Sequence, residues 1–367
     1  MSESITLFAN NLRRLRKSAG MTQAELARAI GYSEKTVSKW ECASGIPDID
    51  GLFALSRQLQ VSVEELFADN SAVYFLGIDG GGTKTTMLLT DAGGHSLRKI
   101  KIDASNPMDI GLEACTQLLR RGIYEICDGV DLSSVVMFAG IAGATSVKEE
   151  LQSFFKTIPL RMAFCDSDNA SIMEAALGDR DGITMILGTG ICVWSKVDGK
   201  AYRTGGWGYL VNEGGSAFDI GQDALKAYYA TVDGSATPTE LTFAIGDIFR
   251  DDAALLKQIY AGGKKWIASL APMVFEAAEA GDSTAKAIIH RNLSVAARMI
   301  ETAAQRFTNS PVEVVITGGM TNQPQVLQLL NSALKEPGKF DLRILDAEPV
   351  KGAVALAQKF WSKAQTP

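Results

Sequence analysis

The sequence is poor in cysteine and histidine and lacks any long apolar run. Its five cysteines are scattered along 367 residues without a CxxC pair, which is typical of buried thiols in a reducing compartment and gives no metal signature. No apolar run approaches the roughly 18–20 residues of a membrane span, and the first residues lack the apolar core of a secretion signal. We therefore expect a cytoplasmic protein with no membrane partner.

Two common nucleotide-binding motifs are also missing. Neither GxxxxGK[ST] nor GxGxxG occurs in the chain, which excludes a Walker loop and a dinucleotide fingerprint. The formal net charge of -6 argues against a protein that coats nucleic acid non-specifically, although a small DNA-reading module remains compatible with it. The length and a hydrophobic content of 46% predict a globular protein of two or three domains.

The first part of the chain has helical periodicity. In MTQAELARAIGYSEKTVSKWE, residues 21–41, Thr22 and Glu25 form a capping box, Gly31 ends one helix and Ser33 caps the next. Two short helices around a glycine-containing turn are typical of a helix-turn-helix unit. The side chains that we expect to face DNA are polar or charged: Gln23, Ser33, Glu34, Lys35, Thr36, Ser38 and Lys39.

The segment from this motif to SVEELF, residues 21–67, resembles the Cro-repressor or XRE family of helix-turn-helix domains. The resemblance implies operator DNA as a partner. Such domains read two half-sites about one helical turn apart, so it also implies a homodimer.

The character of the sequence changes near residue 71. Helical spacing gives way to a continuous apolar run at residues 73–78, which predicts a buried strand. Almost no linker separates the two parts, so we expect a restricted relative orientation rather than a loose tether.

Three times in the rest of the chain, an apolar strand ends in a glycine cluster. The strands are expected at residues 73–78, 183–187 and 312–317. Glycines let the backbone approach a ligand closely and point several N–H groups into one concavity. Asp79, just before the first cluster, is placed to hold a hydrated Mg2+, although a plain hairpin turn remains an alternative there. The predicted nucleotide- or phosphate-binding residues are Gly80, Gly81, Gly82, Thr83, Lys84 and Thr85, then Gly188, Thr189 and Gly190, then Gly318 and Gly319.

The spacing of these corners resembles the actin, Hsp70 and sugar-kinase superfamily, in which two RNase H-like domains close on ATP. Within it, the chain from about residue 73 resembles the BadF/BadG/BcrA/BcrD ATPase family and its N-acetylglucosamine kinase branch. The resemblance implies ATP and Mg2+ as cofactors and an N-acetylated amino sugar or a hexose as substrate. We expect an all-α helix-turn-helix domain at residues 1–70 and an α/β actin-like ATPase with RNase H-like subdomains at 71–180 and 181–367, the second with a helical insertion.

A kinase of this type needs a carboxylate to take the proton from the sugar hydroxyl. In FCDSDNASIMEAALG, residues 164–178, Asp168 matches the family's Asn-Asp-Ala position, with Ser167 in place of the Asn. Asp166 is the rival candidate. Either residue could instead cap the helix that follows, since Asp is a preferred N-cap.

The resemblance also implies a set of sugar contacts. TGGWGYLVNEGGSAFDIG, residues 204–221, resembles the family's GGWG…DEGSA segment and places Gly206 and Glu213 beside the sugar, although the Asn-Glu-Gly-Gly run departs from Gly-Asp-Glu-Gly. Asn106 and Gly143 match two more sugar-contacting positions. For Asn106, a turn before Pro107 is an equally good interpretation, and Trp207 is expected to pack rather than to stack on the sugar.

Two functions remain open at this point. The protein is either a DNA-binding regulator that still phosphorylates a sugar, or a non-enzymatic regulator that senses sugar and ATP through a change of conformation. A third function, the activation of an iron–sulfur dehydratase, is disfavoured because MILGTG, residues 185–190, lacks the cysteine that such activators carry before this turn.

Overall fold

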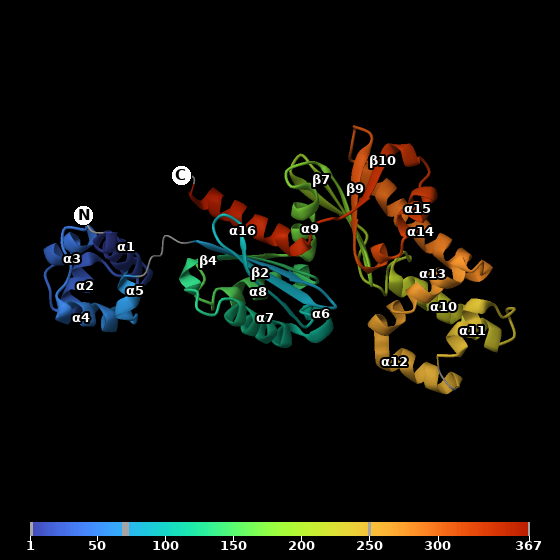
Figure 1. Cartoon of the computed structure of the whole chain (residues 1–367), viewed down its shortest axis with the longest axis horizontal. Coiled ribbons are helices and arrows are strands. Elements are labelled where there is room, and N and C mark those ends of the chain that lie inside the picture. The colour runs from blue at the N-terminus through green and yellow to red at the C-terminus, as the bar shows by residue number, and fades with distance from the viewer. Residues whose placement is uncertain (1–2, 68–72, 249–250, 366–367) are drawn as a thin grey trace.

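The computed structural model describes residues 3–67, 73–248 and 251–365, and it divides them into a helical unit and two α/β units (Figure 1). The boundary that we predicted between residues 70 and 71 lies outside the described residues. No helix in the described ranges combines the length and the hydropathy needed to traverse a lipid bilayer.

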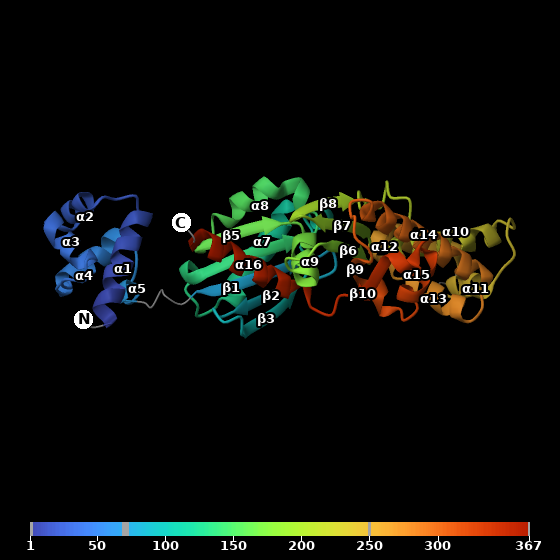
Figure 2. The ribbon, with the colours of Figure 1, turned by 90° about the horizontal axis from the view of Figure 1, so that it is seen from above.

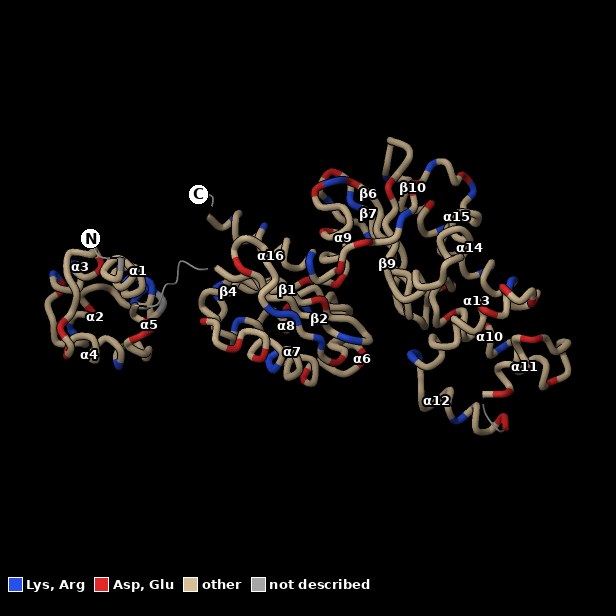
Figure 3. The backbone as a smooth tube through the Cα atoms, viewed as in Figure 1, with Lys and Arg blue, Asp and Glu red and all other residues tan. Residues whose placement is uncertain are grey.

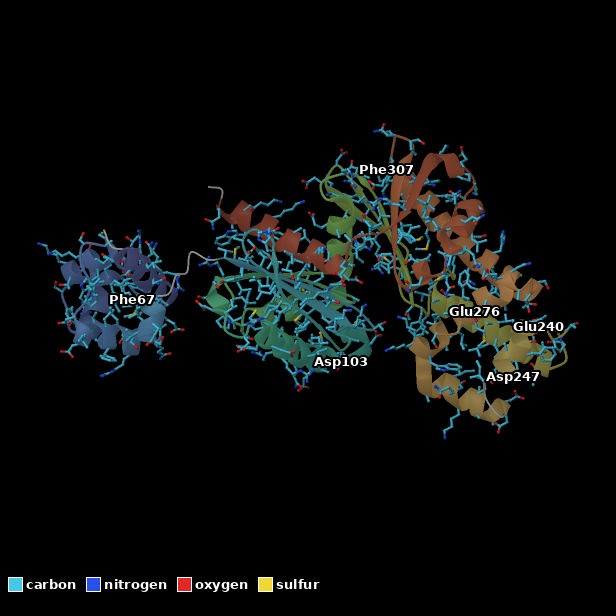
Figure 4. The ribbon with its side chains drawn as sticks, viewed as in Figure 1. Phe67, Asp103, Glu240, Asp247, Glu276 and Phe307 are labelled. Carbon is cyan, nitrogen blue, oxygen red and sulfur yellow. The ribbon has the colours of Figure 1, made fainter. Side chains whose placement is uncertain are left out.

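The N-terminal unit packs five helices around one small core. Phe8, Leu26, Val37 and Leu55 are among its fully buried side chains, and Phe67, labelled in Figure 4, closes the core against Phe8 at 5.2 Å between ring centres. The expected capping box of Thr22, the left-handed Gly31 and the Ser33 cap are confirmed. The helices are α1 (Glu3–Ser18), α2 (Gln23–Ile30), α3 (Glu34–Glu41), α4 (Ile49–Leu59) and α5 (Val63–Phe67).

The first α/β unit is built on a five-stranded sheet of order β3-β2-β1-β4-β5, in which β1, β4 and β5 are parallel, β2 is antiparallel to β1, and β3 is antiparallel to β2. Successive residues of β1 face opposite sides: Leu76 packs toward α7 and α8, whereas Phe75 packs toward α16. The elements are β1 (Tyr74–Gly80), β2 (Thr85–Thr90), β3 (Ser96–Ile102), α6 (Pro107–Ile110), α7 (Leu112–Ile126), η1 (Leu132–Ser134), β4 (Val135–Ile141), η2 (Ala144–Val147), α8 (Lys148–Phe155) and β5 (Met162–Asp166).

The second α/β unit follows the linking helix α9 and has a sheet of order β10-β9-β6-β7-β8. The largest core of the chain lies between this sheet and the helices inserted between β8 and β9, while α9 covers the opposite face through Met173 and Leu177. The elements are α9 (Asp168–Leu177), β6 (Gly182–Leu187), β7 (Ile191–Val197), β8 (Lys200–Thr204), α10 (Ala217–Val232), α11 (Glu240–Gly246), α12 (Asp252–Ala268), α13 (Ala271–Glu279), α14 (Ser283–Ala304), β9 (Val312–Thr317), η3 (Gly319–Asn322), α15 (Val326–Ala333), η4 (Pro337–Lys339) and β10 (Phe340–Ile344).

The last helix, α16 (Pro349–Gln365), returns to the first unit. Its apolar side, Val350, Ala353 and Val354, packs on β1 and β4, and Figure 2 shows it lying beside the strands of the first sheet. Our assignment of all residues from 181 onward to the second subdomain is therefore wrong for α16. The helix crosses α9 at Gly352, where a Cβ atom would meet the carbonyl oxygen of Ser171 at 1.9 Å.

Candidate functional site

The carboxyl ends of the central strands of the first sheet carry two acidic residues in one row. Asp79 in β1 pairs in register with Gly140 in β4, and Gly140 pairs with Asp166 in β5. Because these strands are parallel, their carboxyl ends lie at the same edge, which is where ligands bind in open α/β sheets. Asp168, two residues after Asp166, begins α9 at this edge.

The turn between β1 and β2 is held firmly against the rest of the sheet edge. The Gly81 amide donates to the Lys84 carbonyl at 3.0 Å, and the Ser105 amide donates to the Gly81 carbonyl at 3.2 Å. Gly82, Thr83 and Lys84 are exposed. The turn is therefore a fixed backbone loop with accessible groups at its tip.

Thr85 does not fit the role predicted for its side chain. The residue is fully buried, and its hydroxyl donates to the Ser105 hydroxyl at 2.8 Å. This buried hydrogen bond joins the start of β2 to the segment after β3. The prediction that Thr85 contacts phosphate through its side chain is therefore wrong.

The second and third glycine clusters meet each other at the ends of β6 and β9. A Cβ atom on Gly318 would lie 2.5 Å from the carbonyl oxygen of Leu187 and 3.0 Å from the Gly188 nitrogen. Gly318 also has a φ of 113°, a region that other residues rarely adopt. The α10 helix starts at this point, since the Ala217 amide donates to the Gly188 carbonyl at 2.9 Å.

The contact between these clusters joins two segments that are far apart in the sequence, and it is possible only because glycine has no side chain. Thr189 and Gly190 are half-buried and Gly319 is exposed.

The two carboxylates nearest the glycine clusters have pKa values above the usual range for aspartate. Burial raises the pKa of Asp79 to about 7, with a further increase from the nearby Asp168 carboxylate, while Lys84 lowers it. Burial also raises the pKa of Asp168 to about 6, whereas backbone N–H groups and Arg203 lower it. Since Arg203 belongs to β8, the field on Asp168 arises from both α/β units.

The structure separates Asp168 from its rival Asp166. Asp166 forms a partly exposed ion pair with Lys148 at 2.6 Å. The N-cap of α9 is Ser167, without a side-chain cap bond. The alternative in which Asp168 caps the helix is therefore wrong, and its carboxylate accepts a hydrogen bond from the adjacent Asn169 amide at 3.0 Å.

The donor set at this edge suits a cation carried by a nucleotide. The described part of the chain contains no group of three or more His, Cys, Asp or Glu side chains placed to hold a metal ion by themselves. Mg2+ usually takes one or two carboxylates and completes its shell with water and substrate phosphates. Asp79 and Asp168, which repel each other across a poorly hydrated space, fit that pattern because a cation between phosphate and carboxylate lets both remain ionised.

Two of the predicted sugar contacts lie together on the first unit. A Cβ atom on Gly143 would be 2.4 Å from Oδ1 of Asn106. Asn106 also caps α6, accepting from the Met108 amide at 3.0 Å and donating to Asp109 at 2.8 Å. The turn-forming role of Asn106 is therefore confirmed, and Asp109 joins the group as a carboxylate that the sequence did not single out.

The GGWG turn after β8 is clamped by an arginine. Arg203 donates through Nε to the Gly205 carbonyl at 2.8 Å and through Nη2 to the Gly206 carbonyl. Its guanidinium also lies 4.3 Å from the centre of the Trp207 ring. Trp207 is 69% exposed and packs against Arg203 rather than in the interior, and whether it stacks on a sugar stays a prediction.

The loop that carries Glu213 is positioned from below by a buried asparagine. Asn292 accepts from the Gly215 amide at 2.9 Å and donates to Asp223 at 2.9 Å, and it is almost fully buried. Glu213 itself is exposed and pairs with Arg298 at 2.8 Å.

No local pattern in the sequence distinguishes Asn292 or Arg203. Arg203 contacts the turn directly after its own strand, whereas Asn292, in α14, contacts a loop 77 residues earlier in the chain. The acidic side chains Glu240, Asp247 and Glu276, by contrast, project from the helical insertion and take no part in the site (Figure 4).

The predicted DNA-facing residues are mostly accessible. Ser33, Glu34, Lys35 and Lys39 are exposed, and Thr36 and Ser38 are half-buried on the same helix, α3. The Ser33 hydroxyl accepts from the Thr36 amide and thereby caps α3. Gln23 donates to Glu41 at 2.8 Å, beside the buried pair of Glu41 with Arg16, so in this structure its amide supports the fold of the unit. In Figure 3, Lys and Arg positions are interspersed with Asp and Glu positions along the helical unit and both α/β units.

Comparisons with known proteins agree with this architecture. Residues 76–357 match the model of the BadF/BadG/BcrA/BcrD ATPase family, and residues 12–66 match a helix-turn-helix family model.

Individual relatives span most of the α/β part. An N-acetylmuramic acid/N-acetylglucosamine kinase of Clostridium acetobutylicum is 28% identical over 264 residues, which cover 68% of this chain and 86% of that protein. An N-acetyl-D-glucosamine kinase of Dictyostelium discoideum is 26% identical over 309 residues, 77% of this chain and 97% of that protein. The crystal structure of a putative N-acetylglucosamine kinase from Chromobacterium violaceum superposes with a TM-score of 0.66 at 24% identity over 78% of this chain and 99% of that one, which shows the shared fold.

Proposed function

Because this chain belongs to the BadF/BadG/BcrA/BcrD ATPase family and carries a helix-turn-helix unit, we propose that it is a DNA-binding transcriptional regulator that also phosphorylates a sugar with ATP. The observation that carries the proposal is the position of Asp168. It stands at the carboxyl edge of the first sheet, next to Asp79 and within the field of Arg203 from the second unit.

In the proposed reaction, Asp168 accepts the proton of the sugar hydroxyl that attacks the γ-phosphorus of ATP. A carboxyl whose pKa is about 6 is largely ionised at neutral pH, yet it is more basic than an ordinary aspartate, as a general base requires. The backbone amides at the three glycine corners supply donors for the phosphate oxygens. Mg2+, held through Asp79, would neutralise charge on the phosphates.

The proposed substrate is an N-acylated amino sugar. The names of the relatives from Clostridium acetobutylicum and Dictyostelium discoideum include N-acetylglucosamine, and this chain groups Asn106 with Gly143 on one side. Gly206 and Glu213 lie on the second unit. The α3 helix is the proposed reader of operator DNA, through its exposed Lys35 and Lys39 among others.

Turnover tests the enzymatic part directly. We expect ADP release in the presence of N-acetylglucosamine or N-acetylmuramic acid, tested beside a panel of hexoses, and its loss in Asp168→Asn. Asp166→Asn is the matched control, because it removes a carboxylate two residues away that is already paired with Lys148. Turnover that Asp168→Asn leaves unchanged would contradict the assignment.

If no sugar supports turnover in the wild-type protein, the non-enzymatic sensor becomes the better description. That function requires a sugar that changes operator affinity without ATP, because a ligand shifts a conformational equilibrium only by its differential affinity for the two states.

A further inference from the structure

One serine near the start of α9 carries a buried hydroxyl without a hydrogen-bond partner. Ser171 is fully buried, and its Oγ makes no hydrogen bond within the part of the chain that the structure describes. Burying a polar group without a partner is costly, and native proteins keep few such groups. The Ser171 hydroxyl is therefore available to an acceptor that comes within its reach.

Other helical serines of this chain satisfy their hydroxyls within the helix. Ser294 and Ser332 each donate to the carbonyl four residues earlier, at 2.7 and 2.9 Å, which is a common bond for a helical serine. The equivalent acceptor for Ser171 is the Ser167 carbonyl, and the hydroxyl does not use it. The Ser171 side chain is thus not tied to its own helix.

The Ser171 hydroxyl lies at the edge of the first sheet, beside Gly140. A Cβ atom on Gly140 would clash with Oγ of Ser171, so the hydroxyl occupies the space that a side chain of β4 would take. Gly140 pairs in register with Asp79 of β1. Neighbouring strands are roughly 5 Å apart, so the hydroxyl lies beside the Asp79 side chain if both project from the same face.

The preceding residues of the two strands show that the face is shared. Phe138, two residues before Gly140, packs with α16. A Cβ atom on Gly77, two residues before Asp79, would lie 2.8 Å from Val354 of the same helix. Because side chains alternate along a strand, Gly140 and Asp79 also belong to this face.

Asp79 has no hydrogen-bond donor of its own for its carboxylate among the described residues. The charges that act on it are the carboxylates of Asp168 and Glu348, which repel it, and Lys84, which attracts it. A carboxylate that binds a metal ion is usually itself held by a hydrogen bond, which fixes its orientation. Ser171 places such a donor on the protein side of Asp79.

We propose that Ser171 is a positioning residue for Asp79: its hydroxyl donates to one oxygen of the Asp79 carboxylate and leaves the other oxygen for the Mg2+ that accompanies ATP. The proposal rests on the metal-binding role of Asp79 in the function proposed above. The serine keeps its proton and only orients the carboxylate. The donor has a fixed support, because the backbone of Ser171 meets Gly352 of α16 on the other side of α9.

This role differs from a structural one in what it predicts for Ser171→Ala. The substitution removes a hydroxyl that bonds nothing in the described chain, so the thermal unfolding temperature without nucleotide should not fall. Loss of a hydrogen bond to a metal-binding carboxylate typically weakens metal binding about 10–100-fold. The variant should therefore be impaired only where Mg2+ takes part.

The experiment measures the affinity of the full chain for a fluorescent ATP analogue, once with Mg2+ and once with EDTA. Ser171→Ala should weaken binding by about tenfold with Mg2+ and leave binding with EDTA unchanged. Adding Ser171→Ala to Asp79→Ala should cause no further loss, because the carboxylate that the hydroxyl orients is already absent.

Ser195→Ala is the matched control. Ser195 is also fully buried, and its hydroxyl likewise lacks a partner among the described residues. It lies in β7 opposite Ile183, at the end of β6 remote from Gly188. The change should leave the affinity for the ATP analogue unaltered both with Mg2+ and with EDTA.

The outcomes separate the two proposals. A wild-type affinity that is the same with Mg2+ and with EDTA overturns the metal-binding role of Asp79 itself. A wild-type protein that needs Mg2+, together with an unaffected Ser171→Ala variant, overturns only the positioning role. Equal weakening with Mg2+ and with EDTA also overturns it, because Ser171 then supports the site in general. A further loss in the Asp79→Ala background does the same.

Discussion

The two α/β units share one topology but differ in chemistry. In both sheets the central strand has an antiparallel neighbour through a glycine turn and a parallel neighbour on the other side, with one further strand at each edge. Asp79 lies in the second-to-last residue pair that β1 forms with β2 before their turn. Ile186 lies in the equivalent pair of β6 with β7. The same backbone thus presents a carboxylate in the first unit and an apolar side chain in the second.

This difference indicates a division of labour. The first unit contributes the acidic groups, Asp79 and Asp168, whereas the second contributes backbone, through the contact of Gly188 with Gly318. The fold fixes where the strand ends lie, and a few residues at those ends decide what each half can do.

The largest expected effect comes from the acidic half. Asp168→Asn should lower kcat for sugar phosphorylation by about 10²–10⁴-fold with little change in the KM for ATP, because it removes the proton acceptor but no phosphate contact. Steady-state kinetics with a coupled ADP assay measures both parameters. If Asp166→Asn caused the larger loss, the comparison of the two carboxylates would be reversed.

The glycine contact of the second unit can be tested with two neighbouring residues. Gly318→Ala should destabilise the protein by about 1–3 kcal/mol, since its Cβ atom would press on the Leu187 carbonyl at a φ of 113°. Gly319→Ala meets nothing within 4 Å and should leave the unfolding free energy unchanged while it weakens ATP binding. Urea denaturation and nucleotide titration separate these effects. Equal stability of the two variants would show that the contact between the clusters is not needed.

A third change tests the buried support of the sugar loop. Asn292→Ala removes the acceptor of the Gly215 amide and one donor to Asp223, which keeps its ion pairs with Arg291 and Lys226. The KM for the sugar should therefore rise about tenfold, equivalent to roughly 1–2 kcal/mol. The KM for ATP should change little, because the loop follows β8 rather than a glycine corner. Asn331→Ala is the matched control, because Asn331 is exposed on α15. An equal rise in both KM values would indicate general loosening of the second unit.

The smallest expected effect is a pH dependence of stability that belongs to the first unit. The pKa of Asp79 is raised to about 7 in the folded protein, so the folded state retains a proton that the unfolded state loses above about pH 4. Stability from this group is present at pH 4 and declines as the pH rises through 7.

After allowance for screening by water, the free energy of unfolding should fall by on the order of 1 kcal/mol over this pH range. Thermal unfolding without nucleotide or metal, at pH 5 and pH 8, measures it. Asp79→Asn should flatten the profile, and a profile that stays as steep would place the titration elsewhere.

Local sequence predicted the strands and turns well, because each depends on its own residues. The structure has β6 at Gly182–Leu187 and β9 at Val312–Thr317, as the apolar runs indicated, and the Thr22 and Ser33 caps follow from side chains within one turn.

Long-range contacts were harder to predict. The return of α16 to the first sheet depends on which of two apolar surfaces it covers, and its amphipathic pattern suits both. The burial of Thr85 depends on Ser105, twenty residues away, and the support that Asn292 gives to the sugar loop depends on Gly215, 77 residues away.

The crossing of α9 and α16 at Gly352 has a mechanical consequence. The chain passes from the first unit to the second through α9 and returns through α16, and the two connectors touch where the backbone of Gly352 meets Ser171. Because both connections between the two units pass this contact, a change in the angle between the units would have to be absorbed by φ and ψ changes close to it. A side chain at residue 352 would push α16 away from α9 and so strain the connection to both units. Residue 352 lies outside the glycine clusters and the predicted sugar contacts.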